Sequence, residues 1–166
     1  MSSNLMSPFT QQDEIFMRLA IAKASRGTKR GQTPFGACIV RRGKVIACAH
    51  NRVWQTTDIT AHAEVLAIRL ACKKIKSISL KDCVMYSTCE PCPMCFSASH
   101  WAGIKKIYFG ATIGDAKNAG FNELFISAKQ MKSWGKSPVQ VLGGLLRKEN
   151  TSFLKTWAGR INKRVY

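Results

Sequence analysis

Two short motifs constrain the fold of this chain most, because each opens a predicted helix and both carry side chains that bind metals. His62-Ala63-Glu64 lies in the first turn of a helix predicted over 61–75. Cys92-Pro93-Met94-Cys95 opens a second helix, predicted over 92–101. Cysteines three apart in a first helical turn project to one side, and the positive end of the helix dipole favours their thiolates. The sequence therefore predicts a fold that brings two helix starts together around a metal ion.

The ligand set predicts a catalytic zinc site. His62, Cys92 and Cys95 supply three ligands and leave the fourth tetrahedral position to a water or hydroxide, with one Zn²⁺ expected per subunit. Glu64 is badly placed to bind the same ion, but its carboxylate reaches that water and shuttles its proton to a leaving amine. A Cys-x-x-Cys pair alone is more typical of a structural half-site or a redox pair, and the combination with His-x-Glu reverses that balance.

The hydrophobic pattern around these motifs alternates strands and helices, which predicts an α/β fold with a sheet packed on both faces. Helices are expected at 11–24, 61–75, 92–101, 122–131 and 152–162, and strands at 36–40, 44–48, 83–87, 104–110 and 139–142. No repeat, linker or low-complexity tract divides the 166 residues. We therefore expect a single domain over residues 1–166.

Charge and cysteine content bear on partners and compartment. The net charge of +17 attracts polyanions such as RNA, DNA or anionic membranes, although a Lys-rich surface also serves solubility alone. The N-terminal stretch has no targeting pattern and no apolar run is long enough to span a bilayer, so we expect a cytoplasmic protein without a membrane partner. Seven cysteines, an odd number, favour a reducing compartment. Those outside the motif are expected to be small core residues: Cys38, Cys48, Cys72, Cys83 and Cys89.

With these motifs the chain resembles the cytidine deaminase-like superfamily, and within it the bacterial-type guanine deaminases. The segments that carry the resemblance are Thr33–Ala37, Asn51–Val65, Ser87–Cys95, Asp115–Phe121 and Phe153–Tyr166. The resemblance implies a three-layer α/β/α sandwich with a mixed five-stranded sheet, and a homodimer. It also implies zinc on the His and two Cys, with Glu64 as the proton shuttle.

The resemblance further implies roles in a purine pocket, in which Asp115 assists proton transfer or contacts the base. The residues expected to contact substrate are Phe35, Asn51, Ala63, Trp101 and Tyr166. The C-terminal helix and tail, 152–166, are expected to close the pocket. Each residue also has a structural alternative: core aromatics for Phe35 and Trp101, a turn residue for Asn51, a helix N-cap for Asp115 and a frayed end for Tyr166.

The expected reaction is hydrolytic deamination of guanine to xanthine and ammonia. The main alternative is a tRNA adenosine deaminase, which shares the first three segments and suits the basic surface, so nucleic acid is a second, less favoured partner. Segment 115–121 and the aromatic tail do not match the tRNA enzymes in this form. Cytosine, ammeline and guanosine are alternative substrates. A zinc-stabilised RNA-binding module is a non-enzymatic alternative, against which the intact Glu64 argues.

Overall fold

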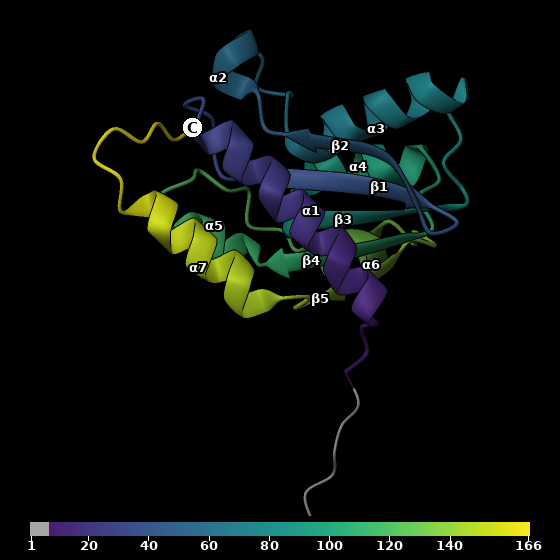
Figure 1. Cartoon of the computed structure of the whole chain (residues 1–166). Helices are drawn as coiled ribbons and strands as arrows, with labels where there is room; N and C mark the ends of the chain where they lie inside the picture. The colour runs from purple at the N-terminus through teal and green to yellow at the C-terminus, as the bar shows by residue number, and fades with distance from the viewer. Residues whose placement is uncertain (1–6) are drawn as a thin grey trace, which may run out of the picture.

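In the computed structural model, which describes residues 7–166, helices and strands alternate along the chain (Figure 1). The elements are α1 (Gln11–Thr28), β1 (Gly36–Arg41), β2 (Lys44–His50), α2 (Val53–Thr56), α3 (Ala63–Ile75), β3 (Cys83–Cys89), α4 (Pro93–Trp101), β4 (Lys106–Ala111), α5 (Ile113–Asn118), α6 (Ala128–Trp134), β5 (Gln140–Gly143) and α7 (Arg147–Ala158). The first six residues, part of the stretch predicted to lack a targeting signal, lie outside the described residues. Within the described part, no helix is long and apolar enough to cross a membrane.

The five strands form one mixed sheet in the order β2-β1-β3-β4-β5. β1 pairs antiparallel with both β2 and β3, whereas β3, β4 and β5 run parallel. This arrangement confirms the predicted five-stranded α/β fold. It also brings the start of β1 and the C-terminal ends of β2, β3 and β4 to the same end of the sheet. At this end Gly36 pairs with His50, Ala37 with Ser87, and Cys89 with Ala111.

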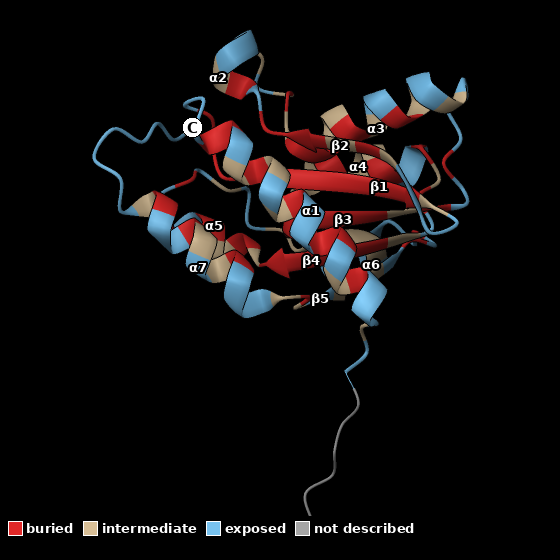
Figure 2. Ribbon diagram, viewed as in Figure 1, coloured by how far each residue is buried: buried red, intermediate tan, exposed pale blue. Residues whose placement is uncertain are grey.

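Helices cover both faces of the sheet, and alternate residues of β1 show how they divide. Ala37 and Ile39 belong to the core that packs against α3, α4 and α6. Cys38 and Val40 belong to the core under α1 on the other face, and α7 packs over β4. The central strands β1, β3 and β4 are accordingly buried, the edge strands β2 and β5 are partly exposed, and the helices are exposed along their outer faces (Figure 2). Three layers result, as in the predicted sandwich.

Local sequence signals explain several element boundaries. α1 begins with a capping box, in which the Thr10 side chain accepts from the Asp13 N–H and the Asp13 carboxylate accepts from the Thr10 N–H. Arg42 and Gly43 join β1 to β2 with positive φ angles of 49° and 73°, as a two-residue hairpin turn of the mirror-image type requires. Pro93 opens α4, where its fixed φ and missing N–H cost nothing.

The structure corrects three sequence expectations. Residues 122–127 are not helical, and the helix expected over 122–131 begins only at Ala128, after the Ser127 cap. α7 begins at Arg147 and ends at Ala158, earlier than expected, and the short helices α2 and α5 were missed. Cys38 and Cys48 are joined by a disulfide, which the expected reducing compartment did not foresee. Their pairing follows from the register, because they lie directly opposite each other on β1 and β2.

Candidate active site

One histidine and two cysteines from separate helix starts converge at the edge where β3 ends. The Nδ1 atom of His62 lies 3.7 Å from the Sγ of Cys92 and 3.5 Å from the Sγ of Cys95. All three ligand atoms lie within 4.8 Å of one another. A tetrahedral zinc with ordinary Zn–N and Zn–S bonds separates its ligand atoms by roughly 3.5 to 3.8 Å. The observed spacing therefore fits zinc, as the two motifs predicted.

The local backbone explains why these side chains are free to bind a metal. His62 is the N-cap of α3 and Cys92 the N-cap of α4, and neither side chain makes a cap hydrogen bond to its helix. The position of Cys92 at a helix N-terminus favours its thiolate. Hydrogen bonding with Cys95 and His62 lowers the pKa of the Cys92 thiol to about 4, so that it is ionised at neutral pH.

Glu64 lies beside this cluster with its side chain buried. Its exposed fraction is 6%, and its Oε1 accepts a hydrogen bond from the Ser87 hydroxyl at 3.3 Å. Burial raises the pKa of Glu64, which favours the protonated carboxyl more than in water. A raised pKa brings a carboxyl closer to the range in which a proton shuttle works.

A small pocket opens on the metal cluster and contains three of the predicted substrate contacts. Phe35, Asn51 and Tyr166 line it together with His62 and Glu64. The Asn51 Nδ2 donates to the Tyr166 hydroxyl at 2.6 Å, and its Oδ1 accepts from the Val53 N–H at 3.1 Å. Asn51 thus serves its own loop and also faces the pocket, so both readings of this residue have a structural basis.

The C-terminal tail reaches the pocket by crossing α2 and the loop before α6. The Arg164 guanidinium lies over the Trp54 ring, 4.6 Å from its centre. The Tyr166 main-chain oxygen accepts from the Asn122 N–H at 3.0 Å. The Tyr166 ring lies 5.6 Å from that of His62, and burial raises the pKa of its hydroxyl. Tyr166 is therefore a part of the pocket wall in this structure.

The sequence analysis assigned no pocket role to two acids that line the pocket, Glu90 and Glu123. Glu123 lines it from the segment after Phe121, and burial raises the pKa of its carboxyl to about 7. The expected helix over 122–131 would have given this residue an ordinary helical setting, so its place in the pocket was not anticipated. Its one sequence signal was an acid beside Phe121 in an apolar stretch of a chain with only 9 Asp and Glu residues.

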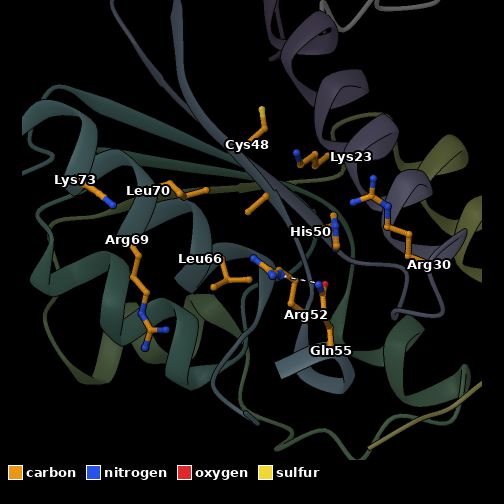
Figure 3. Close-up of a pocket in the computed structure, with 11 residues that line it drawn as sticks. Lys23, Arg30, Cys48, His50, Arg52, Gln55, Leu66, Arg69, Leu70 and Lys73 are labelled. Carbon is orange, nitrogen blue, oxygen red and sulfur yellow. Dashed lines mark hydrogen bonds between the residues drawn. The ribbon is translucent and has the colours of Figure 1, made fainter. Parts of the chain in front are cut away.

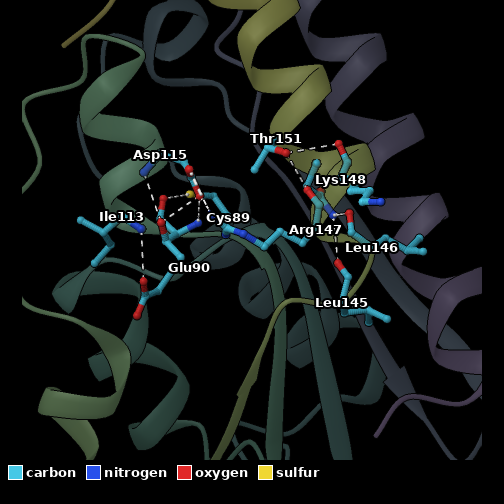
Figure 4. Close-up of polar contacts among 11 residues, drawn as sticks. Cys89, Glu90, Ile113, Asp115, Leu145, Leu146, Arg147, Lys148 and Thr151 are labelled. Atoms are coloured by element: carbon cyan, nitrogen blue, oxygen red, sulfur yellow. Dashed lines mark hydrogen bonds and ion pairs between the residues drawn. The ribbon is translucent and has the colours of Figure 1, made fainter. Parts of the chain in front are cut away.

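Asp115, predicted to be catalytic, is not among the residues that line the pocket. Figure 4 shows it beside Arg147, whose guanidinium nitrogens lie 2.9 and 3.2 Å from the two carboxylate oxygens. It also completes the capping box of α5 with Thr112. Although burial opposes it, hydrogen bonding to Thr112 and Arg147 holds the pKa of Asp115 below its usual range. These contacts join α5 to α7, and they give a catalytic role no geometric support.

Two other expected contacts also lie away from the pocket, and a neighbouring acid is structural. Trp101 is 80% exposed at the end of α4, so it forms no pocket wall within this chain. Ala63 is fully buried at the start of α3 and is not a lining residue. Glu90 lies at the pocket edge, but its carboxylate accepts from the Ile113 and Ala128 N–H groups, the first of α5 and α6. Glu90 therefore anchors two helix starts around the site.

Comparison with known proteins agrees with this geometry. Residues 10–111 match the family described as the cytidine and deoxycytidylate deaminase zinc-binding region. The chain is 40% identical over 154 residues to a guanine deaminase of Bacillus subtilis, covering 92% of this chain and 98% of the relative. It is 33% identical over 153 residues to a tRNA-specific adenosine deaminase of the same organism, covering 92% of each.

Solved structures give the same two kinds of relative. A guanine deaminase from Nitrosomonas europaea superposes with a TM-score of 0.82 at 27% identity, covering 96% of this chain and 99% of the other. A structure from a study of A-to-I editing by tRNA:A34 deaminases has a TM-score of 0.74 at 32% identity, covering 84% and 98%. Both relatives share this fold, so the fold does not by itself separate a free base from an RNA substrate.

Proposed function

The chain belongs to the cytidine and deoxycytidylate deaminase family, and we propose that it deaminates guanine to xanthine and ammonia. The observation that carries the proposal is the covered site, in which Tyr166 closes a small pocket over the metal cluster. A tail that can close again over its ligand suits a free base, which fits wholly beneath it, whereas the neighbours of a nucleotide within an RNA strand would hold the tail open. The guanine deaminase relative, which matches 92% of this chain, supports the same substrate.

The chemistry assigned to each residue follows from its position. His62, Cys92 and Cys95 would hold the zinc, which supplies an activated water as the nucleophile. Glu64 takes a proton from that water and delivers it to the departing amine. Glu123, whose burial raises its pKa to about 7, is a second group able to hold a proton beside the substrate. Water adds to the carbon that bears the exocyclic amine, and the bond from that carbon to nitrogen breaks to release ammonia.

The pocket walls support a planar, polar substrate. Phe35 offers an aromatic face, and the Asn51 amide offers a donor that now bonds the Tyr166 hydroxyl. With Tyr166 in place the cavity measures about 20 Å³, room for about one water molecule. Guanine therefore binds only when the tail moves, and its edge then replaces the Tyr166 hydroxyl as the partner of Asn51.

The test is ammonia release by zinc-replete protein, with guanine, guanosine, cytosine, ammeline, adenine and a tRNA anticodon stem-loop as substrates. We expect turnover of guanine with little dependence on salt, and at least about 10²-fold less with Glu64→Gln protein as the control. If metal-replete protein releases no ammonia from guanine, the proposal is wrong. Ammonia release from ammeline or cytosine alone would support the deaminase reaction but would change the assigned substrate.

A tRNA adenosine deaminase is the second candidate, favoured by the net charge of +17 and by the tRNA-specific relatives. An enzyme that grips an RNA backbone releases counterions, so its apparent affinity falls steeply with salt. Turnover of the stem-loop alone, lost between low and high salt, would establish this candidate in place of the first.

We also propose a homodimer, in line with the resemblance. Exposed aromatic rings support it, since Trp101 is 80% and Trp134 is 67% exposed, and α4 and α6, which carry them, pack against each other. In a dimer Trp101 would have a partner, and only there would it wall a pocket. Light scattering of the eluting protein tests this, with Trp101→Lys expected to shift the mass to that of a monomer. A monomeric parent protein would contradict the proposal.

A further inference from the structure

A second and larger cavity lies beside the C-terminal end of β2, between α1 and α3. It measures about 370 Å³, within the range of small-molecule pockets. α1 and α3 cover opposite faces of the sheet, and both contact its edge strand β2. They therefore flank the cavity from two sides (Figure 3). The cavity shares none of its lining residues with the metal-bearing pocket.

Positive charge surrounds this cavity. Five cations line it: Lys23, Arg30, Arg52, Arg69 and Lys73. None of the eleven lining residues is acidic, and across residues 7–166 no ion pair engages any of the five. The charge of Arg69 helps to lower the pKa of Asp58, but the two side chains form no ion pair.

His50 lies on the cavity wall among these cations. Burial lowers the pKa of His50 and a hydrogen bond to the Asn51 carbonyl opposes that effect, but the charges of Lys23, Arg52 and Arg30 lower it further. The lowered pKa favours the neutral imidazole, and His50 lines the cavity although only 7% of the residue is exposed. Three cations from two separate segments thus act on one point inside the cavity.

Apart from Gln55, which accepts a hydrogen bond from Arg52, the remaining lining residues are apolar. Leu66 and Leu70 of α3 and Ala49 of β2 provide carbon surface between the cations. Protection of the β2 edge does not account for the whole cluster, because Lys74 already donates to the exposed Ile46 carbonyl from outside it. Flat and apolar surface ringed by guanidinium and ammonium groups matches a ligand with a planar base and several phosphates.

We propose that this cavity binds a nucleoside polyphosphate, with the phosphates held by the cations and the base set against the leucines and His50. Arginines bind phosphate oxygens with two parallel hydrogen bonds, and lysines add point charges. A nucleotide and an inorganic polyphosphate share the phosphate chemistry. Only the nucleotide uses the apolar part of the cavity.

The experiment is calorimetric titration of the full, zinc-replete chain at physiological salt with GTP, inorganic tripolyphosphate and guanosine. The site variant is the double substitution Lys23→Glu with Lys73→Glu. The control is Lys129→Glu with Lys148→Glu, which makes the same change in net charge on α6 and α7, away from the cavity. Zinc content and thermal midpoint establish that each variant is folded, and the deaminase assay is not needed for the readout.

We expect GTP to bind, about tenfold tighter than tripolyphosphate because of the base, with guanosine binding weakest. The site variant should lose at least about tenfold in GTP affinity and the control less than about twofold. Equal loss in both variants would overturn the proposal, since bulk charge would then explain binding. Failure of GTP to bind, or binding of a single-stranded RNA oligonucleotide at this site in place of GTP, would overturn it as well.

Discussion

The metal cluster and the pocket wall beside it differ in how they are built. The three ligands and Glu64 come from two motifs of four residues or fewer, each at the start of a helix. The wall combines Phe35, Asn51, Glu123 and Tyr166 from four separate segments, and a side-chain hydrogen bond spans 115 positions of the chain. Each half of the cluster is therefore set by local sequence and only one long-range approach, between two helix starts, completes it, whereas every part of the wall depends on how distant segments dock. Substitutions in the metal cluster should abolish turnover, whereas substitutions in the pocket wall should lower it partially.

The largest expected effect is that of Cys92→Ala, which removes one of three metal ligands. We expect zinc content to fall below stoichiometric binding and ammonia release to fall to background, because a site with two protein ligands binds zinc weakly. The measurement is metal analysis after dialysis, paired with the assay. Cys72→Ala, a free cysteine on α3 outside the cluster, is the matched control and should keep its zinc. Retained zinc in the Cys92 variant would break the comparison.

Glu64→Gln should separate chemistry from metal binding. The amide keeps the size of the side chain but cannot take a proton, so we expect kcat to fall by about 10² to 10⁴-fold with zinc unchanged. Steady-state kinetics and metal analysis on the same preparation measure both. Glu149→Gln, an exposed acid of α7, serves as control. Turnover close to the parent would remove Glu64 from the role of shuttle.

Glu123→Gln should have a smaller effect than Glu64→Gln, if the wall supports the chemistry only in part. We expect kcat/KM to fall by roughly 10 to 100-fold, the low end of what one positioned proton carrier contributes. Asp115→Asn should leave kcat/KM near the parent value, because that carboxylate lies with Arg147 outside the pocket. The reverse order of the two variants would return the catalytic role to Asp115.

Tyr166→Phe tests the docking of the tail alone. Loss of the hydrogen bond to Asn51 costs about 1 kcal/mol, which corresponds to roughly fivefold more frequent opening. The readout is hydrogen exchange of the Asn122 amide, which now donates to the Tyr166 main-chain oxygen. Val165→Ala is the control on the same tail. Unchanged exchange in the Phe variant would mean that other contacts hold the tail closed.

The smallest effect concerns Asp13, a buried acid far from the site that contrasts with Glu123. Burial raises its pKa, but hydrogen bonds from Thr10 and the Tyr86 hydroxyl outweigh burial and leave the pKa below 3.8. A depressed folded pKa contributes stability above the unfolded value, and this stability is lost as pH falls through the folded value. Asp13→Asn should therefore destabilise by about 1 kcal/mol at pH 7 and by less toward pH 3. Denaturant unfolding across that range measures it, and a pH-independent difference would contradict it.

The accuracy of the sequence predictions follows the same division. Strand and helix alternation, the hairpin and both motif helices were readable because each depends on neighbours in the chain, such as the caps and Pro93. The segment after Phe121 was misread as helix, because its residues have helical composition but form an irregular loop whose Asn122 N–H bonds the Tyr166 main-chain oxygen. The Asp115 prediction was unsupported for a related reason. Its partner Arg147 lies 32 residues away and no local pattern announces it.

The proposed metal ligands and Glu64 could be named from the sequence because they lie in two short motifs, each at the start of a helix. The approach of the two helix starts, the pocket acid Glu123 and the Asn51–Tyr166 contact depended on sheet register and on chain packing over long separations. The cationic cavity belongs to the second group. Its cationic residues are spread over positions 23 to 73. They line one cavity only because α1 and α3 both pack beside the edge strand β2.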